Sequence, residues 1–188
     1  MDTIEYKLPF DYISDLQDSY EAAQAEGDTN LVRTLDILGL WNEDAEPRWL
    51  RRVWWALQDD GNAQSRMGWM FDWSDESPVQ VDRDFNNPEL AVYWYEKAAK
   101  NGVAAAQCNL ANLYCGSRLP KDKWNGKLAV YWREQSAAQK EPNGMRGLAH
   151  CLTCGRCCEG GCDYNRAGAL FREAAEIEKA RQESEKGE

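Results

Sequence analysis

Several features that are common in enzymes are scarce or missing in this 188-residue sequence. Histidine occurs once, as His150, so a Ser-His-Asp triad, a two-histidine zinc site or a histidine relay would depend on that single residue. No glycine loop of the Walker or dinucleotide-binding type is present, because Gly160-Gly161 is only a turn signal. Acidic pairs such as Asp59-Asp60 lack identifiable partners that would shift their pKa values. These absences predict a protein that is not an enzyme and has no cofactor.

Long apolar runs are absent as well. No stretch approaches the roughly 18 residues of a membrane span, and the first residues are acidic where a secretory signal would be basic. We therefore expect a cytoplasmic chain whose thiols stay reduced. The odd cysteine total, seven, agrees because internal pairing cannot be complete. With 43% hydrophobic and 29% charged residues, the sequence is typical of a soluble domain that buries its own core.

Charge is distributed unevenly around a net value of −10. Residues 1–89 carry 20 acidic and 7 basic side chains, whereas residues 90–188 carry 12 and 15. An acidic field of this kind repels nucleic acid and anionic membranes and speeds association with a basic protein. Blocks of charge also serve as solvated faces that only confer solubility, and this alternative is equally open. The pattern says nothing about the oligomeric state.

What the sequence does contain is an internal repeat. The segment LAVYWYEKAA at 90–99 returns as LAVYWREQSA at 128–137 and more faintly as RAGALFREAA at 166–175, each time after 38 residues. A second apolar element recurs at the same step, at 110–114 and 148–152. The first element has the stripe of an amphipathic helix, whose small alanines let a second helix approach closely. Its stripe residues are Ala91, Trp94, Tyr95, Ala98 and Ala99.

The repeat unit is expected to be a helical hairpin. Asn101-Gly102 ends the first helix in the manner of a left-handed cap, and residues 104–114 form the second. A degenerate copy of the repeat precedes these. Residues 63–71 align with 106–114 at a step of 43, and the extra length falls in the loop after 71. Residues 47–58 are its helical partner.

The flanking segments complete the expected architecture. Residues 1–45 are predicted to form an N-terminal capping hairpin, with Asp28 and Thr29 as candidate caps of its second helix. Residues 46–182 hold the repeats and a C-terminal capping helix in one continuous domain, and 183–188 form a frayed tail. No pattern predicts a sheet. The fold class is therefore all-α, an α/α superhelical solenoid of about seven or eight helices.

The repeated residues resemble the Sel-one-like repeat family, a relative of the tetratricopeptide repeats. The resemblance rests on Ala-x-x-Trp-Tyr-x-Lys-Ala-Ala-x-x-Gly followed by Ala-Gln-x-x-Leu-Ala-x-Leu-Tyr, and it covers residues 50–180. It implies a right-handed superhelix that acts as an adaptor or scaffold and holds another protein in its concave groove. A cysteine-rich bacterial branch of the family bridges each repeat with a disulfide. Here Ala98 or Ala99 stands opposite Cys108, so that bridge is absent.

The sequence departs from the family pattern in three places. Ala111 replaces the glycine that the family favours in the second helix, the loop after residue 71 is enlarged, and the second repeat has Ser136 and a cysteine-rich end. That end, CLTCGRCCEGGC at 151–162, has five of the seven cysteines. Cys151 aligns with Leu113, which favours a small buried hydrophobe. A zinc site and a disulfide or redox site remain open; the zinc set would be Cys151 or His150 with Cys154, Cys157 or Cys158, and Cys162.

Tryptophan is concentrated in the first half, with six of nine between 41 and 73. Part of that content fills the core, but Trp54 and Trp55 point about 100° apart on a helix, so one face cannot easily bury both. Exposed aromatic residues beside carboxylates are typical of binding hot spots. The predicted partner-binding residues are Trp55, Asp59, Asp60, Asp72, Trp73, Asp75, Glu76, Asp82, Asp84 and the groove residues Tyr93, Glu96, Lys97, Tyr131 and Glu134.

These observations lead to three functional hypotheses. The first is a protein-binding solenoid that resembles bacterial immunity proteins, which block a basic toxin domain by covering its active site; this step is an analogy with family members. The second is a scaffold or signalling adaptor that binds a partner peptide in the concave groove. The third is a thiol-dependent or zinc-dependent regulator centred on residues 151–162.

Overall fold

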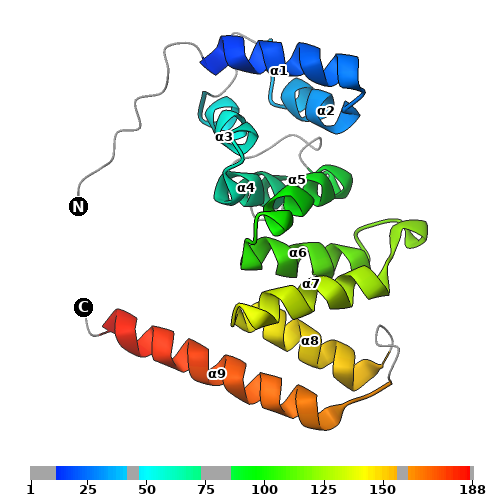
Figure 1. Ribbon diagram of the computed structural model, residues 1–188, viewed down its shortest axis with the longest axis vertical. Helices are drawn as coiled ribbons and strands as arrows, with labels where there is room; N and C mark the ends of the chain where they lie inside the picture. The colour runs from blue at the N-terminus through cyan, green and yellow to red at the C-terminus, as the bar shows by residue number, and fades with distance from the viewer. Residues whose placement is uncertain (1–11, 42–46, 73–85, 156–160, 187–188) are drawn as a thin grey trace.

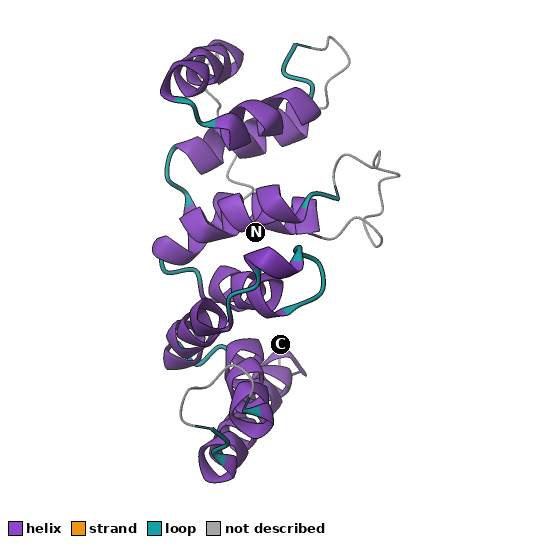
Figure 2. Ribbon diagram, turned by 90° about the vertical axis from the view of Figure 1, so that its right-hand side faces the viewer, coloured by secondary structure: helices purple, strands orange, loops and turns teal. Residues whose placement is uncertain are grey.

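The chain is a stack of helices in the computed structural model, which describes residues 12–41, 47–72, 86–155 and 161–186. Among the described residues there are nine α-helices and a short 3₁₀ turn, and no strand occurs in these ranges (Figures 1 and 2). The predicted all-α fold is confirmed, with one helix more than the upper expectation. The elements are α1 (Tyr12–Glu26), α2 (Thr29–Ile37), α3 (Pro47–Leu57), α4 (Gly61–Asp72), α5 (Pro88–Lys100), α6 (Ala104–Cys115), η2 (Lys121–Lys123), α7 (Gly126–Ala138), α8 (Pro142–Cys154) and α9 (Tyr164–Lys186).

The helices follow one another along a single axis, from α1 at the top of Figure 1 to α9 at the bottom. The most extensive packing joins α4 to α5, α6 to α7 and α8 to α9. The expected hairpin of α5 with α6 also forms, but its two helices pack less extensively than these three pairs. The closely packed pairs therefore begin at α4, one helix before the first helix of the expected hairpin. Two helices can pack closely even when the loop that connects them is long.

Helix starts repeat at the 38-residue step. The side chains of Asn87, Asn125 and Asp163 accept hydrogen bonds from the backbone N–H groups three residues ahead, at 3.2, 3.1 and 2.9 Å. Such an N-cap satisfies one of the free N–H groups at the beginning of a helix. The same device thus starts α5, α7 and α9 and sets the register of each copy.

Helix ends repeat as well, in backbone conformation rather than in residue type. Gly102 has φ +79°, as the predicted left-handed cap requires. The equivalent positions hold Asp59 (φ 63°) and Lys140 (φ 58°), the two described non-glycine residues with positive φ. An L-residue in this region costs about 1–2 kcal/mol. The tight turns between α3 and α4 and between α7 and α8 therefore carry local strain that the turn after α5 avoids.

The core consists of the small and aromatic residues of the repeated stripes. Trp94, Tyr95, Ala91 and Ala98 of α5 are fully buried. One large cluster runs from Leu16 to Ala129. A second, small cluster holds the C-terminal helices together and consists of Leu148, Ala149, Leu152 and Ala167.

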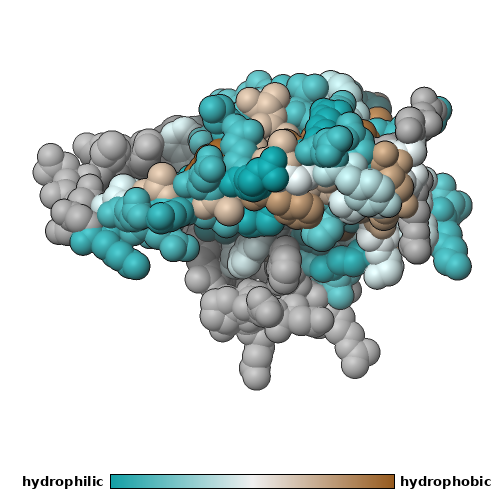
Figure 3. All heavy atoms as spheres, turned by 90° about the horizontal axis from the view of Figure 1, so that it is seen from below, coloured by the Kyte–Doolittle hydropathy of each residue, from teal (hydrophilic) through white to brown (hydrophobic). Residues whose placement is uncertain are grey.

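The two ends of the stack differ. The N-terminal helices are joined to the repeats by long-range hydrogen bonds, for example from Trp54 Nε1 to Asp15 Oδ2 at 2.8 Å and from Trp94 Nε1 to Thr34 Oγ1 at 3.1 Å. At the other end α9 continues to Lys186, four residues past its expected end at Gln182. Its last turns are polar, with an i,i+4 ion pair between Lys179 and Glu183. Viewed from this end, the surface is mostly hydrophilic (Figure 3).

None of the described helices combines the length and the apolarity that crossing a bilayer would require.

Candidate functional site

The helices of the stack form two rows, α4, α6 and α8 in one and α5, α7 and α9 in the other, and the two rows are spaced differently. Helix α6 packs against α8, and α4 against α6, whereas α5, α7 and α9 make few contacts or none with one another. In a curved array the inner elements approach each other more closely than the outer ones, so we place α4, α6 and α8 on the inner row. The predicted groove residues Tyr93, Glu96, Lys97, Tyr131 and Glu134 lie on α5 and α7, in the other row. Their role in binding a partner stays a prediction.

Within α5, the predicted groove residues are engaged inside the chain. The hydroxyl of Tyr93 donates to Asp28 Oδ2 at 2.7 Å, and burial together with Asp28 raises the pKa of Tyr93. Glu96 accepts a hydrogen bond from the hydroxyl of Tyr114 at 2.5 Å. The ammonium group of Lys97 lies over the Tyr93 ring, 4.9 Å from its centroid. These contacts tie α5 to α2 and α6.

The predicted acidic residues that the structure describes also hold the fold. Asp59 accepts hydrogen bonds from Asn101 Nδ2 at 2.8 Å and from Gln64 Nε2 at 3.1 Å, which keep the pKa of its carboxyl below the usual value. Asp60 caps α4 by accepting from the N–H groups of residues 62 and 63. Asp72 is buried and lies 3.2 Å from an Arg118 nitrogen, yet burial dominates and raises its pKa.

Five other predicted contacts cannot be placed. Trp73, Asp75, Glu76, Asp82 and Asp84 lie outside the described residues.

Trp55 is half-buried and lies edge-on against the buried Trp54, with the ring centroids 4.8 Å apart. The adjacent tryptophans thus face different environments, as the helical geometry predicted. Trp55 lines a cavity of about 290 Å³ together with Arg52, Asp60, Asn62, Ala63 and Arg66.

An apolar surface lies on α7 and the turn before it, and of its three residues the sequence analysis named Tyr131. Trp124 is 44%, Leu128 38% and Tyr131 49% exposed. Leu128 and Tyr131 are three positions apart on α7, so they share one face of the helix, and Trp124 lies in the turn just before its N-cap, Asn125. We call these three residues the α7 stripe. Glu134, the other predicted residue on this helix, is exposed and forms a 3.3 Å ion pair with Arg166.

The same residue types are covered in the preceding repeat. Leu90 and Tyr93 of α5 are the counterparts of Leu128 and Tyr131. Leu90 is fully buried, and Tyr93 bonds to Asp28, the N-cap residue of α2. The start of α2 therefore contacts Tyr93 on α5, whereas its counterpart Tyr131 on α7 is open. The sequence could not reveal this difference because both copies read LAVYW.

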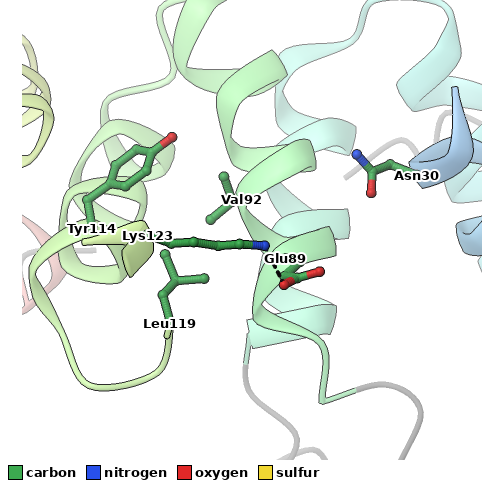
Figure 4. Close-up of a pocket in the computed structure, with 6 residues that line it drawn as sticks. All are labelled: Asn30, Glu89, Val92, Tyr114, Leu119 and Lys123. Carbon is green, nitrogen blue, oxygen red and sulfur yellow. Dashed lines mark hydrogen bonds and ion pairs between the residues drawn. The ribbon is translucent and has the colours of Figure 1, made fainter. Parts of the chain in front are cut away.

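A pocket of about 390 Å³ lies between α2, α5 and the loop after α6 (Figure 4). The ammonium group of Lys123 lies 2.6 Å from Glu89 Oε1 across it, and this bond keeps the pKa of the Glu89 carboxyl low. The pocket thus presents a mixture of charged and apolar groups. The described residues that line it are Asn30, Glu89, Val92, Tyr114, Leu119 and Lys123.

The cysteine-rich end is described only in part. Cys151 is buried as predicted, but its sulfur accepts a hydrogen bond from Arg133. Cys154 and Cys162 are exposed free thiols, whereas Cys157 and Cys158 lie outside the described residues. Within the described ranges, no group of three or more His, Cys, Asp or Glu side chains could hold a metal ion. His150 is exposed and contacts the Phe171 ring edge-on, with the ring centroids 5.3 Å apart.

The comparisons with known proteins agree with the repeated helix pairs that the structure shows. A family model described as the Sel1 repeat, the Sel-one-like repeat of the sequence analysis, matches residues 61–103, 104–141 and 142–177. These boundaries coincide with the tightly packed helix pairs α4–α5, α6–α7 and α8–α9. The search of curated proteins found no match.

Two solved structures are similar to this chain. A Sel1 repeat protein from Oxalobacter formigenes is 23% identical, with a TM-score of 0.54 over 67% of this chain and 88% of that one. A protective antigen of uropathogenic Escherichia coli strains, which displays an SLR fold, is 26% identical, with a TM-score of 0.53. That match covers 82% of this chain but only 32% of the antigen.

Proposed function

The chain belongs to the Sel1 repeat family, and from this membership we propose that it acts as an immunity protein, binding a basic bacterial toxin domain and blocking it sterically. Solenoids of this family are scaffolds for protein–protein interaction and are generally not catalytic. The proposal adds to that role a surface, the α7 stripe, and a class of partner.

The observation that carries the proposal is the difference between α5 and α7. On α5, Leu90 is fully buried and Tyr93 is hydrogen-bonded to Asp28, the N-cap residue of α2. On α7, Leu128 and Tyr131 have the same spacing but are open to solvent. Clustered exposed aromatic and aliphatic side chains are what binding hot spots use. Because the start of a helix contacts the equivalent face within this chain, the occupant of the α7 stripe is a helix of the partner.

The charge distribution supports a basic partner. Helices α1 and α2 expose Asp18, Glu21, Glu26 and Asp36, and five further acidic or aromatic candidates lie in the segment 73–85. Negative potential at this end attracts a positively charged protein and raises its association rate. When the partner docks on α7, this chain covers part of the partner's surface. It then blocks the partner by steric occlusion, without a chemical reaction.

A second candidate function is an adaptor that binds a partner peptide. The pocket beside α5 favours it, because 390 Å³ accommodates one or two side chains and Lys123 and Glu89 supply charged groups at its edge. This function does not require the partner to be toxic.

The test begins with isolation of the bound protein from native cells, followed by purification of both proteins. We expect Leu128→Glu to weaken binding by about tenfold or more, since it places a charge in an apolar contact. Ala169→Glu is the matched control, because Ala169 is the exposed counterpart of Tyr131 on α9. The association rate measured by surface plasmon resonance should fall as salt rises.

Growth assays separate the two functions. The partner expressed alone should arrest growth, co-expression of this chain should restore it, and Leu128→Glu should not. A partner that binds through the α7 stripe without affecting growth would favour the adaptor. Unchanged affinity of Leu128→Glu would overturn the proposed surface.

A further inference from the structure

Arg133 occupies a position that holds an aromatic residue in the neighbouring repeats. Its counterparts at the 38-residue step are Tyr95 and Phe171, and like Tyr95 it is buried, with 8% of its surface exposed. Room for the longer side chain comes from Gly147, where an added Cβ would lie 2.7 Å from Arg133 Nε. At this core position the second repeat therefore has a charged side chain where the neighbouring repeats have an aromatic one.

The guanidinium group lies between two cysteines. Its Nη1 contacts Cys151 Sγ at 2.6 Å, and its Nη2 contacts Cys115 Sγ at 3.0 Å and Asn112 Oδ1 at 3.1 Å. Its Nε is buried and has no hydrogen-bond partner. No carboxylate of the described residues forms an ion pair with it. The nearby carboxylates have other partners, since Glu178 pairs with Arg146 and Glu141 with Arg181.

A buried guanidinium without a counter-charge is costly. Arginine cannot lose its proton in a protein, and an uncompensated buried charge costs several kcal/mol. Burial lowers the pKa of Arg133, but Cys115 and Cys151 outweigh it and the pKa is raised. The two sulfurs are the groups in contact with Arg133 that can carry negative charge.

The two cysteines differ in accessibility. Cys151 is only 2% exposed, whereas Cys115 is half-buried and lies at the end of α6. Both lie in the last turns of helices, where the backbone dipole disfavours an anion. Arg133, by contrast, brings a positive charge into contact with both sulfurs. The third nearby thiol, Cys108, is buried, and burial raises its pKa.

We propose that the Arg133 guanidinium, in contact with the sulfurs of Cys115 and Cys151, makes Cys115, the accessible member, a site of oxidation by hydrogen peroxide. The thiolate sulfur attacks one peroxide oxygen, an S–O bond forms, and the O–O bond breaks. The sulfur is oxidised to sulfenic acid, and the departing hydroxide takes up a proton to become water. This site is independent of the α7 stripe and of the proposed immunity function.

The experiment treats the full-length reduced protein with hydrogen peroxide and dimedone, which traps sulfenic acids, and locates the adducts by tandem mass spectrometry. Cys154 and Cys162 are internal controls, because they are more exposed than Cys115 and their sulfurs bond to the backbone carbonyls of Cys151 and Thr153. We expect Cys115 to be labelled about tenfold faster than either. Such selectivity follows from thiolate character, since the thiolate is the reactive form.

Two variants test the part played by Arg133. Arg133→Tyr restores the residue found at Tyr95 and should slow labelling of Cys115 by about tenfold or more, since a unit charge at this distance is worth at least that factor. Arg133→Lys keeps a cation and should retain most of the labelling. Circular dichroism confirms that each variant is folded. Labelling of Cys115 at the rate of Cys154, or unchanged labelling in Arg133→Tyr, would overturn the proposal.

Discussion

Gly68 of α4 lies against the ring of Tyr95 on α5. A Cβ at this glycine would be 2.4 Å from Tyr95 Cδ1, and the ring is fully buried, so it cannot move aside. We expect Gly68→Ala to lower the free energy of unfolding by about 2 kcal/mol, since the clash outweighs the better helix propensity of alanine. Urea denaturation followed by circular dichroism measures the change.

Gly168 of α9 provides the control for that prediction. An added Cβ there would meet only Arg172 Nη1 at 3.6 Å, an ordinary contact. Gly168→Ala should therefore raise stability by about 0.5–1 kcal/mol. Equal effects of the two substitutions would mean that the α4–α5 contact does not constrain position 68.

The contacts that individual charged side chains make could be predicted only in part from the sequence. Asp59, Asp60 and Asp72 were predicted to bind a partner because carboxylates beside exposed aromatic residues attract a basic protein. In the structure their hydrogen bonds and ion pair hold turns and helix ends together, and the binding role stays a prediction. Arg133 carried a signal that could be read beforehand, because it is the one charged residue in a column otherwise filled by Tyr95 and Phe171.

Between elements, the hydroxyl of Tyr93 links α5 to the N-cap of α2 through Asp28. We expect Tyr93→Phe to lower the free energy of unfolding by about 1–2 kcal/mol, because Asp28 would lose a hydrogen bond to a charged acceptor. Tyr131→Phe removes the hydroxyl of the equivalent, exposed residue on α7 and should leave stability unchanged. Thermal melts of the two variants compare their stabilities. Equal losses of stability would refute the conclusion that α2 stabilises α5 through Tyr93.

The left-handed helix end predicted at Gly102 is present. The N-caps at Asn87, Asn125 and Asp163, which the sequence analysis did not identify, recur at the 38-residue step of the repeat. The pairing of helices was predicted less well, because sequence adjacency suggested α5 with α6 whereas the tightest packing joins α4 with α5. Packing area depends on interhelical distance and side-chain fit, which the order of helices does not specify.

For the whole molecule, the two separate hydrophobic clusters imply uneven stability. The C-terminal cluster is small, and repeat arrays are stabilised by contacts between neighbours, so their ends open first. We expect amides of α8 and α9 to exchange with deuterium faster than those of α4–α6. Leu148→Ala should accelerate exchange in α8 and α9 and leave α4 and α5 unchanged.

Leu110 is the counterpart of Leu148 on α6 and belongs to the large cluster. Leu110→Ala should therefore spread faster exchange over α4–α7, and its cost should be about 2–5 kcal/mol, as for other buried leucines. If both substitutions accelerated exchange uniformly along the chain, the stack would unfold as one unit and the gradient would be refuted.

The sequence by itself determined the repeat, the all-helical solenoid and the helix ends, because a stripe of alanines and aromatics with a fixed period has one way to be buried, against its neighbour. Only the tertiary structure decided which copy of that stripe stays open, which acidic residues serve the fold and which thiols meet Arg133. Identical segments such as LAVYW differ only in what packs on them, and such contacts arise from distant parts of the chain.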